Sequence, residues 1–160
     1  MYRTFISSSI LKTRDDITLI DKYLRKKINE RFNGKNLNFK EIIALTNTIT
    51  SNTINFTFSK TSNNPNTILT TKKANCIGYA SLYNSIGNYI LVQQQLKHHY
   101  KFTHLVGKLS FLGFDIHQFI DTPFFKDHDF NLIKNLKTGQ QIYVDPSLSD
   151  YFYIDEVTCK

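Results

Sequence analysis

The sequence predicts a single α+β domain, spanning residues 1–160, in which helices come first and an antiparallel β-sheet follows. Apolar residues recur at intervals of three and four in the first half of the chain, which is typical of amphipathic helices. The second half holds runs of aromatic and β-branched residues separated by turn residues, which is typical of strands. The length of 160 residues suits one domain that buries its own core. Runs of helix followed by runs of strand indicate the α+β class.

Two amphipathic helices are expected first. The first covers residues 16–32, with Asp15 as its N-cap and the Asn-Gly pair at residues 33 and 34 as its stop. The second begins at Asn38, because the Asn38 side chain can cap the helix while Glu41 reaches back to the cap. The apolar stripes of the two helices are Ile17, Ile20, Leu24 and Ile28, and Ile42, Leu45 and Ile49.

The segment that follows is expected to be mostly loop. A short extended piece, TINFTF, alternates apolar and polar residues. After it comes a long polar stretch, SKTSNNPNTILTTKKAN, and loops longer than about 12–15 residues in a compact domain are usually functional or disordered. This predicted loop leads directly to Cys76.

Helical spacing resumes at Cys76 and continues to about Lys97. Its apolar face consists of Cys76, Tyr79, Ala80, Tyr83, Ile86 and Ile90. Beyond it, strand-like composition begins with YKFTHLVGKLSFLGFDIHQFI and continues in KDHDFNLIKNL and QIYVDPSL. The turn sequence KTGQ between the last two runs predicts a β-hairpin.

Composition and charge restrict the function classes. An aromatic content of 14%, with 13 Phe and 9 Tyr, is too high for a disordered chain. The net charge of +7 can attract nucleic acid, anionic lipid or an acidic polymer. The lysines are scattered, however, and the densest basic run, KYLRKK, fits the solvated face of a helix, so nucleic-acid binding is disfavoured.

No membrane span is expected, because no run of apolar residues is long enough to cross a bilayer. The N-terminus lacks the pattern of a secretory signal. A cytoplasmic protein and an exported protein whose leader has been removed fit these observations equally well, so the compartment stays open.

Cys76 has the position of a nucleophile. A thiol attacks as its thiolate, of which only a few per cent exists at neutral pH at the ordinary pKa of about 8.5. The N-terminus of a helix favours negative charge, and its free N–H groups can stabilise an oxyanion. A buried structural cysteine is the alternative interpretation. Two cysteines make no disulfide framework, so Cys76 and Cys159 are both expected to be free thiols.

His128 and Asp145 supply a base and an orienting carboxylate. The predicted hairpin carries His128 on one strand and Asp145 on the neighbouring strand. We expect Asp145 to accept the Nδ1 hydrogen of His128, which fixes the tautomer and leaves Nε2 to face the thiol. Cys76, His128 and Asp145 would then form a catalytic triad.

The other histidines are expected to have different places. His98 and His99 follow a helix and fit the surface, whereas His104 and His117 have apolar neighbours and fit core imidazoles. Together they match no zinc-ligand spacing, and Cys76 has no CxxC partner. We therefore expect neither a metal nor a cofactor.

Three segments resemble the transglutaminase-like superfamily. CIGYASLYNSI is similar to its nucleophile segment of Cys, three residues, Ala and an apolar helix; HDFNLI is similar to its His-any-Trp-Asn strand; and YVDPSL is similar to its Val-Asp-Pro-Thr strand end. LVGKL also resembles the strand between the motifs, and the resemblance covers residues 39–148. It implies a papain-like core in which the cysteine helix packs on an antiparallel sheet bearing His and Asp. Phe130 in place of Trp, and Asn75 before the cysteine, depart from the pattern.

The resemblance implies a cysteine-nucleophile acyl-transfer enzyme acting on a peptide, a protein or another amide through a thioester. Cys76 would be the nucleophile, His128 the base and acid, and Asp145 the orienter. Hydrolysis is favoured over protein crosslinking, because the chain lacks the extra β-domains and calcium-site acidic clusters of animal crosslinking enzymes. The alternatives are a catalytically inactive binding module that keeps the fold and a true protein-glutamine crosslinking transferase.

Overall fold

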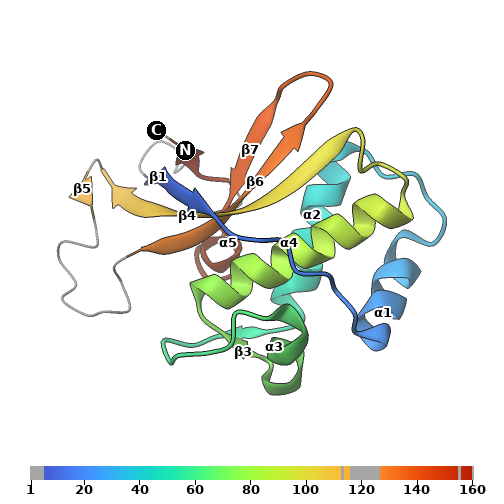
Figure 1. The fold of residues 1–160 in the computed structure, drawn as a ribbon, viewed down its shortest axis with the longest axis horizontal. Helices are drawn as coiled ribbons and strands as arrows, with labels where there is room; N and C mark the ends of the chain where they lie inside the picture. Colours follow the sequence, from blue (N-terminus) through green and yellow to red (C-terminus); the bar gives the residue numbers. More distant parts are fainter. Residues whose placement is uncertain (1–5, 113, 116–126, 155, 160) are drawn as a thin grey trace.

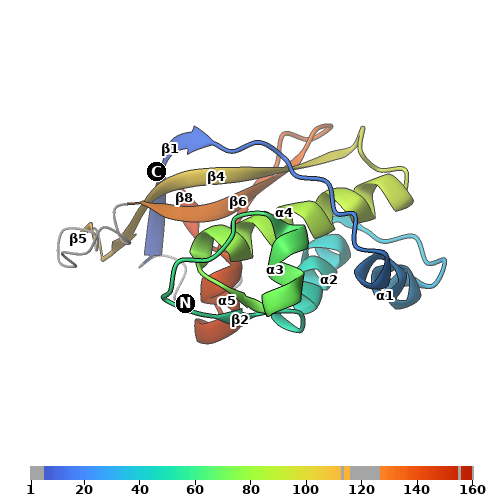
Figure 2. The ribbon, with the colours of Figure 1, turned by 60° about the horizontal axis from the view of Figure 1, so that its bottom comes forward.

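The computed structural model describes residues 6–112, 114–115, 127–154 and 156–159. These residues form two layers, a twisted sheet above a layer of helices (Figures 1 and 2). The helices are α1 (Lys22–Phe32), α2 (Phe39–Ser51), α3 (Pro65–Thr71), α4 (Cys76–Gln93) and α5 (Pro146–Phe152). The strands are β1 (Ile6–Thr13), β2 (Asn55–Phe56), β3 (Lys73–Ala74), β4 (Tyr100–Phe111), β5 (Phe114–Asp115), β6 (His128–Asn135), β7 (Gln141–Val144) and β8 (Thr158–Cys159).

The main sheet has the strand order β7-β6-β4-β1-β8, with β5 attached to β4. Its neighbours pair in antiparallel fashion, except β8, which runs parallel to β1. The short strands β2 and β3 form a separate parallel pair. The chain therefore has the α+β class that the sequence predicts, with a mostly antiparallel sheet.

The expectation that helices come first is wrong, because the first element is the strand β1. Its sequence, ISSSILKT, has three successive serines and lacks a clean alternation of apolar and polar residues. A register shift between Ile10 and Lys12 further interrupts the two-residue period. Gly107 on β4 permits a close approach of β1, since a Cβ atom at Gly107 would lie 1.8 Å from the Ser9 carbonyl oxygen. Long-range pairing of this kind leaves no local signal in the sequence.

The second predicted helix is confirmed with its cap, whereas the first is shorter than predicted. In α2 the Asn38 side chain accepts from the Glu41 N–H at 3.0 Å, and the Glu41 carboxylate accepts from the Asn38 N–H at 2.8 Å. The helix α1 starts at Lys22, because Asp21, rather than Asp15, is its cap. The apolar residues ahead of this cap, among them the buried Leu19, lie outside the helix.

The polar stretch before Cys76 is more ordered than the loop that the sequence predicts, since it contains α3 and β3. Asn64 caps α3 by accepting from the Asn66 N–H at 2.9 Å, and Pro65 fills the first helical turn, where a missing N–H costs nothing. After α3 the chain pairs with β2 and then enters α4 at Cys76. The nucleophile candidate therefore follows a fixed segment.

The helix α4 is the centre of the helical layer (Figure 2). It starts at Cys76 as predicted and ends at Gln93, before the predicted Lys97. A Cβ atom at Gly87 would lie 2.4 Å from the Phe102 ring, so Gly87 lets α4 pack closely against β4. Among the helices of the described ranges, none is both long and apolar enough to cross a membrane.

The predicted hairpin is confirmed as β6 and β7, joined by a turn in which Gly139 has a φ of +75°. The residues after Asp145 do not continue the strand, because Pro146 begins α5. The termini of the described chain lie on the same side of the molecule (Figure 1).

Candidate active site

Cys76 is the first residue of α4, and Asn75 is its N-cap. The Asn75 side chain accepts from the Gly78 N–H at 3.2 Å, and the Asn75 N–H donates to the Thr61 hydroxyl at 3.3 Å. Helix geometry leaves the N–H groups of Cys76 and Ile77 without intrahelical partners. Cys76 is 8% exposed, so its sulfur lies at the edge of the core beside free backbone donors. Capping of α4 therefore accounts for the asparagine that stands before the cysteine.

Asp145 is held rigidly at the end of β7. It is fully buried and is the N-cap of α5. Its Oδ1 atom accepts from the Ser147 and Leu148 N–H groups at 3.1 Å each and from the Ser147 hydroxyl at 2.6 Å. The other oxygen, Oδ2, is left to face His128 and hydrogen-bonds with it.

The structure brings His128 and Asp145 together, but through Nε2 of the ring rather than the expected Nδ1. The register gives the reason: Asn131 lies opposite Val144, so Asp145 is a diagonal neighbour of His128. Nε2, which lies farther from the backbone than Nδ1, reaches across this diagonal to Asp145. The expected contact through Nδ1 is therefore wrong, and Nδ1 is the nitrogen that remains for the thiol.

Charges link His128 to both of its predicted partners. Burial alone would lower the pKa of His128, but the Asp145 carboxylate and, after it, Cys76 outweigh burial and raise the pKa well above its ordinary value. Burial would raise the pKa of Asp145, whereas His128, Ser147 and the Leu148 N–H lower it. Since the His128 side chain is 13% exposed, these interactions are only weakly screened. The site therefore favours a protonated imidazole between two groups that can carry negative charge.

A comparison of the chain with protein-family models, curated proteins and solved structures found no match. The function is therefore inferred from the residues and their geometry.

Arg14, His104 and Asp129 form a second polar cluster. Arg14 donates from Nε to Asp129 Oδ2 at 2.5 Å and from Nη2 to Oδ1 at 3.1 Å. The Nε2 atom of His104 lies 2.7 Å from the same Oδ2. His104 is 2% exposed, so the expected buried and paired imidazole is confirmed. Arg14 was not predicted, because the strand β1 that leads to it was not predicted. The only signal of this cluster in the sequence was the position of Asp129 next to His128.

The remaining candidates lie elsewhere. His98 and His99 are exposed, as expected, and His117 lies outside the described residues. Within the described ranges, no group of three or more His, Cys, Asp or Glu side chains is arranged to hold a metal ion.

Cys76 and Cys159 are free thiols. Burial raises the pKa of Cys159, and its hydrogen bond with Tyr143 opposes this effect.

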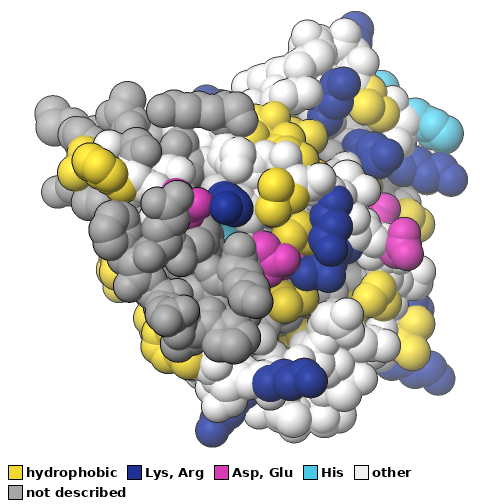
Figure 3. Space-filling model, turned by 60° about the vertical axis from the view of Figure 1, so that its left-hand side comes forward, with side chains coloured by type: hydrophobic (Ala, Val, Ile, Leu, Met, Phe, Trp, Pro, Cys, Tyr) yellow, Lys and Arg dark blue, Asp and Glu magenta, His cyan; other side chains and the backbone are white. Residues whose placement is uncertain are grey.

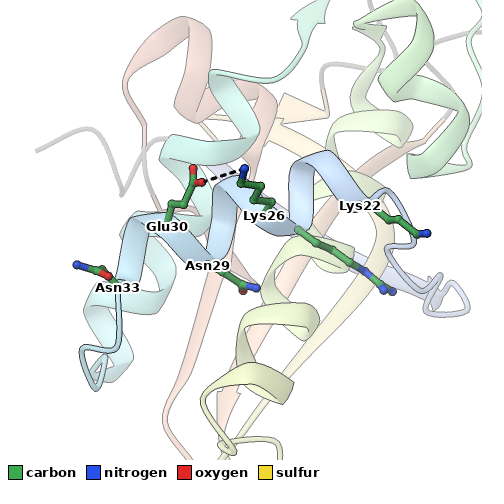
Figure 4. Close-up of a pocket in the computed structure, with 6 residues that line it drawn as sticks. Lys22, Lys26, Asn29, Glu30 and Asn33 are labelled. Carbon is green, nitrogen blue, oxygen red and sulfur yellow. Dashed lines mark ion pairs between the residues drawn. The ribbon is translucent and has the colours of Figure 1, made fainter.

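A shallow hollow of about 520 Å³ lies on α1, away from these residues (Figure 4). Lys26 and Glu30 lean toward each other there, with Nζ and Oε1 3.9 Å apart, and Asn29 points away from them (Figure 4). The Lys26 and Glu30 side chains are 76% and 62% exposed. The run KYLRKK therefore presents a solvated helix face, and none of the candidate triad residues lines this hollow.

On the face of the molecule drawn in Figure 3, the described side chains form no continuous basic surface. The Lys and Arg side chains are interspersed with apolar, acidic and other polar side chains.

Proposed function

We propose that this protein is a cysteine-nucleophile acyl-transfer enzyme that hydrolyses a peptide, isopeptide or other amide bond. The observation that supports it best is the position of His128, which hydrogen-bonds to the buried Asp145 and also interacts with Cys76 at the start of α4. Acyl transfer requires a nucleophile, a base that contacts it, and a carboxylate that orients the base. The resemblance of the three segments to the transglutaminase-like superfamily agrees with this proposal.

In the first half of the reaction Cys76 acts as a thiolate, and its proton is held on Nδ1 of His128. The thiolate attacks the carbonyl carbon of the substrate, and the N–H groups of Cys76 and Ile77 stabilise the resulting oxyanion. The C–N bond then breaks as His128 returns the proton to the leaving nitrogen. The products are a free amine and a thioester on Cys76.

In the second half, His128 takes a proton from water, and the hydroxide attacks the thioester carbon. The C–S bond breaks, the carboxylic acid leaves, and the Cys76 thiolate and the His128 imidazolium are restored. Asp145 stabilises the imidazolium in both halves through Nε2. An amine in place of water would give a transferase with the same intermediate, which is the crosslinking alternative.

The test measures the reactivity of Cys76 toward iodoacetamide in the full chain, with Cys159 as the internal control. We expect Cys76 to be alkylated at least about tenfold faster than Cys159 at pH 7, because a neighbouring imidazolium favours the thiolate. Peptide mass spectrometry after timed quenching measures both rates. His128→Gln is expected to remove most of the difference.

A second measurement does not depend on access of the reagent. Thiolate absorbance near 240 nm is compared between the unmodified chain and Cys76→Ser across neutral pH. Equal absorbance, together with equal alkylation rates at the two cysteines, would show that Cys76 is not activated and would favour an inactive binding module.

A further inference from the structure

Arg14 is directed toward the helical layer by the end of β1. Its N–H donates to the His104 carbonyl oxygen at 2.9 Å, which extends the β1–β4 pairing beyond Thr13. His104 in turn lies opposite Asn131, whose side chain donates to the Ala80 carbonyl oxygen of α4 at 3.1 Å. Residues opposite one another in a sheet share a face. The Arg14 side chain therefore lies on the face of the sheet that α4 covers.

The guanidinium of Arg14 is fixed in direction by Asp129. The Nε edge of Arg14 makes the two-point contact with this fully buried carboxylate, and His104 holds the carboxylate from its other side. The Arg14 side chain is 27% exposed. A guanidinium has five N–H donors. In the contacts of the described residues, its Nη1 group takes no part in the pairing and can serve a second acceptor.

A hollow of about 420 Å³ lies in front of Arg14. The residues that line it and carry charge or hydrogen-bonding groups are Lys12, Thr13, Arg14, Asp15, Asn63, Ser81 and His104. The cations here are Lys12 and Arg14, and the carboxylates are the exposed Asp15 and the buried Asp129, which engages only one edge of the guanidinium. A fixed guanidinium with a free edge matches the two oxygens of a carboxylate, and the hydroxyl and amide groups add further hydrogen bonds.

The hollow and the candidate triad are linked through α4 and β6. Ser81 belongs to α4, the helix that Cys76 begins. The pKa of Arg14 is raised chiefly by its hydrogen bond to Asp129, against the effect of burial, and further by the charges of Asp129, Asp127 and Cys76. Asp129, which holds Arg14, also directly follows His128 in β6.

We propose that this hollow receives a carboxylate group of the substrate and that Arg14 selects it. The inference rests on the acyl-transfer function proposed for Cys76 and adds the substrate class: an amide that carries a carboxylate close to the bond that is cleaved. Asp129 and His104 are positioning residues, because they hold the guanidinium without touching the substrate.

The test compares two alkylating reagents of nearly equal size, iodoacetate, which carries a carboxylate, and neutral iodoacetamide. The rate ratio of the two reagents at Cys76 is measured at pH 7 in the full chain. We expect the ratio to fall about three- to tenfold in Arg14→Gln, because one nearby unit charge is lost, while the iodoacetamide rate changes little. Arg14→Lys, which keeps the charge, is expected to restore most of the ratio.

Lys137→Gln is the matched control. It also removes one positive charge, but from the exposed turn between β6 and β7. Its ratio at Cys76 should equal that of the unmodified chain, and the ratio at Cys159 should be unchanged in every variant. The imidazolium of His128 also attracts iodoacetate, but this contribution is common to all four chains and cancels in the comparison.

The outcomes separate this inference from the proposed function. Rapid alkylation by iodoacetamide with the same ratio in Arg14→Gln and in the unmodified chain overturns the carboxylate pocket and leaves acyl transfer standing. Slow alkylation of Cys76 by both reagents overturns both. Should Arg14→Gln not fold because Asp129 loses its partner, Arg14→Gln with Asp129→Asn is compared with Asp129→Asn alone, and the ratio is expected to be lower in the double variant, because these two chains differ only at Arg14.

Discussion

At the scale of single residues, the buried Asp145 sets the protonation of His128. Asp145→Asn removes the charge and leaves the burial, so the pKa of His128 is expected to fall. An NMR titration of the His128 ring signal measures this change. The new amide would also donate to Nε2, which would place the ring proton on Nδ1 and slow alkylation of Cys76.

Asp150→Asn is the matched control, because Asp150 also lies near the core but accepts from the Tyr79 hydroxyl at 2.7 Å. It should leave the titration of His128 unchanged. An equal shift in both variants would mean that a general loss of negative charge, and no specific contact, raises the pKa of His128.

The three members of the candidate triad could be proposed from the sequence, whereas Arg14 could not. His128 and Asp145 lie on the two strands of one hairpin, so a turn signal is enough to pair them. The ring nitrogen that faces Asp145 depends on a diagonal of the register, which a turn signal does not give. Arg14 reaches Asp129 only through strand pairing between distant parts of the chain.

At the scale of elements, the N-terminus of α4 affects both the stability of the fold and the reactivity of Cys76. Asn75→Ala removes the side chain that accepts from the Gly78 N–H, and loss of an N-cap costs about 1 kcal/mol. We expect a lower free energy of unfolding in urea. Because fraying would also displace Cys76, the first residue of the helix, its alkylation rate should fall as well.

Asn38→Ala separates these two effects, since Asn38 caps α2 in the same way. It should destabilise the chain by a similar amount without changing the alkylation rate of Cys76. If the two variants slowed alkylation equally, the change would follow global stability and not the geometry of the α4 N-terminus.

Elements with a local signature were predictable, and those without one were not. The capping box of α2 and the turn of the β6–β7 hairpin are both read from short stretches of sequence. The strand β1 lacks such a signature, because its pairing with β4 joins the start of the chain to its second half. The helix α3 was hidden in a polar stretch, although Asn64 and Pro65 carry the signal of a helix start.

At the scale of the whole molecule, buried ion pairs tie stability to pH. The pKa values of Asp129 and Asp145 are lowered, against burial, by His104 with Arg14 and by His128, respectively. Their stabilisation is present above the unfolded pKa of about 4 and is lost as pH falls through the folded values. The pKa of His128 is raised, so its stabilisation is present below about pH 6.5 and is lost as pH rises through the folded value.

We therefore expect the free energy of unfolding to decline toward both acid and alkaline pH, as measured by urea denaturation from about pH 3 to pH 10. Because the pair of His128 and Asp145 contributes to both declines, Asp145→Asn should flatten both. Parallel profiles for the variant and the unmodified chain would show that other groups set the pH dependence.

The strand β1 also determines how the molecule responds to mechanical force. It runs parallel to β8, with Ser7 beside Thr158 and Ser8 beside Cys159. A pull applied between residues 6 and 159 would load the hydrogen bonds of this pair in shear, all together, instead of opening them one after another. Since Arg14 directly follows β1, tension that drew this strand along the sheet would also pull on the residue that is paired with Asp129.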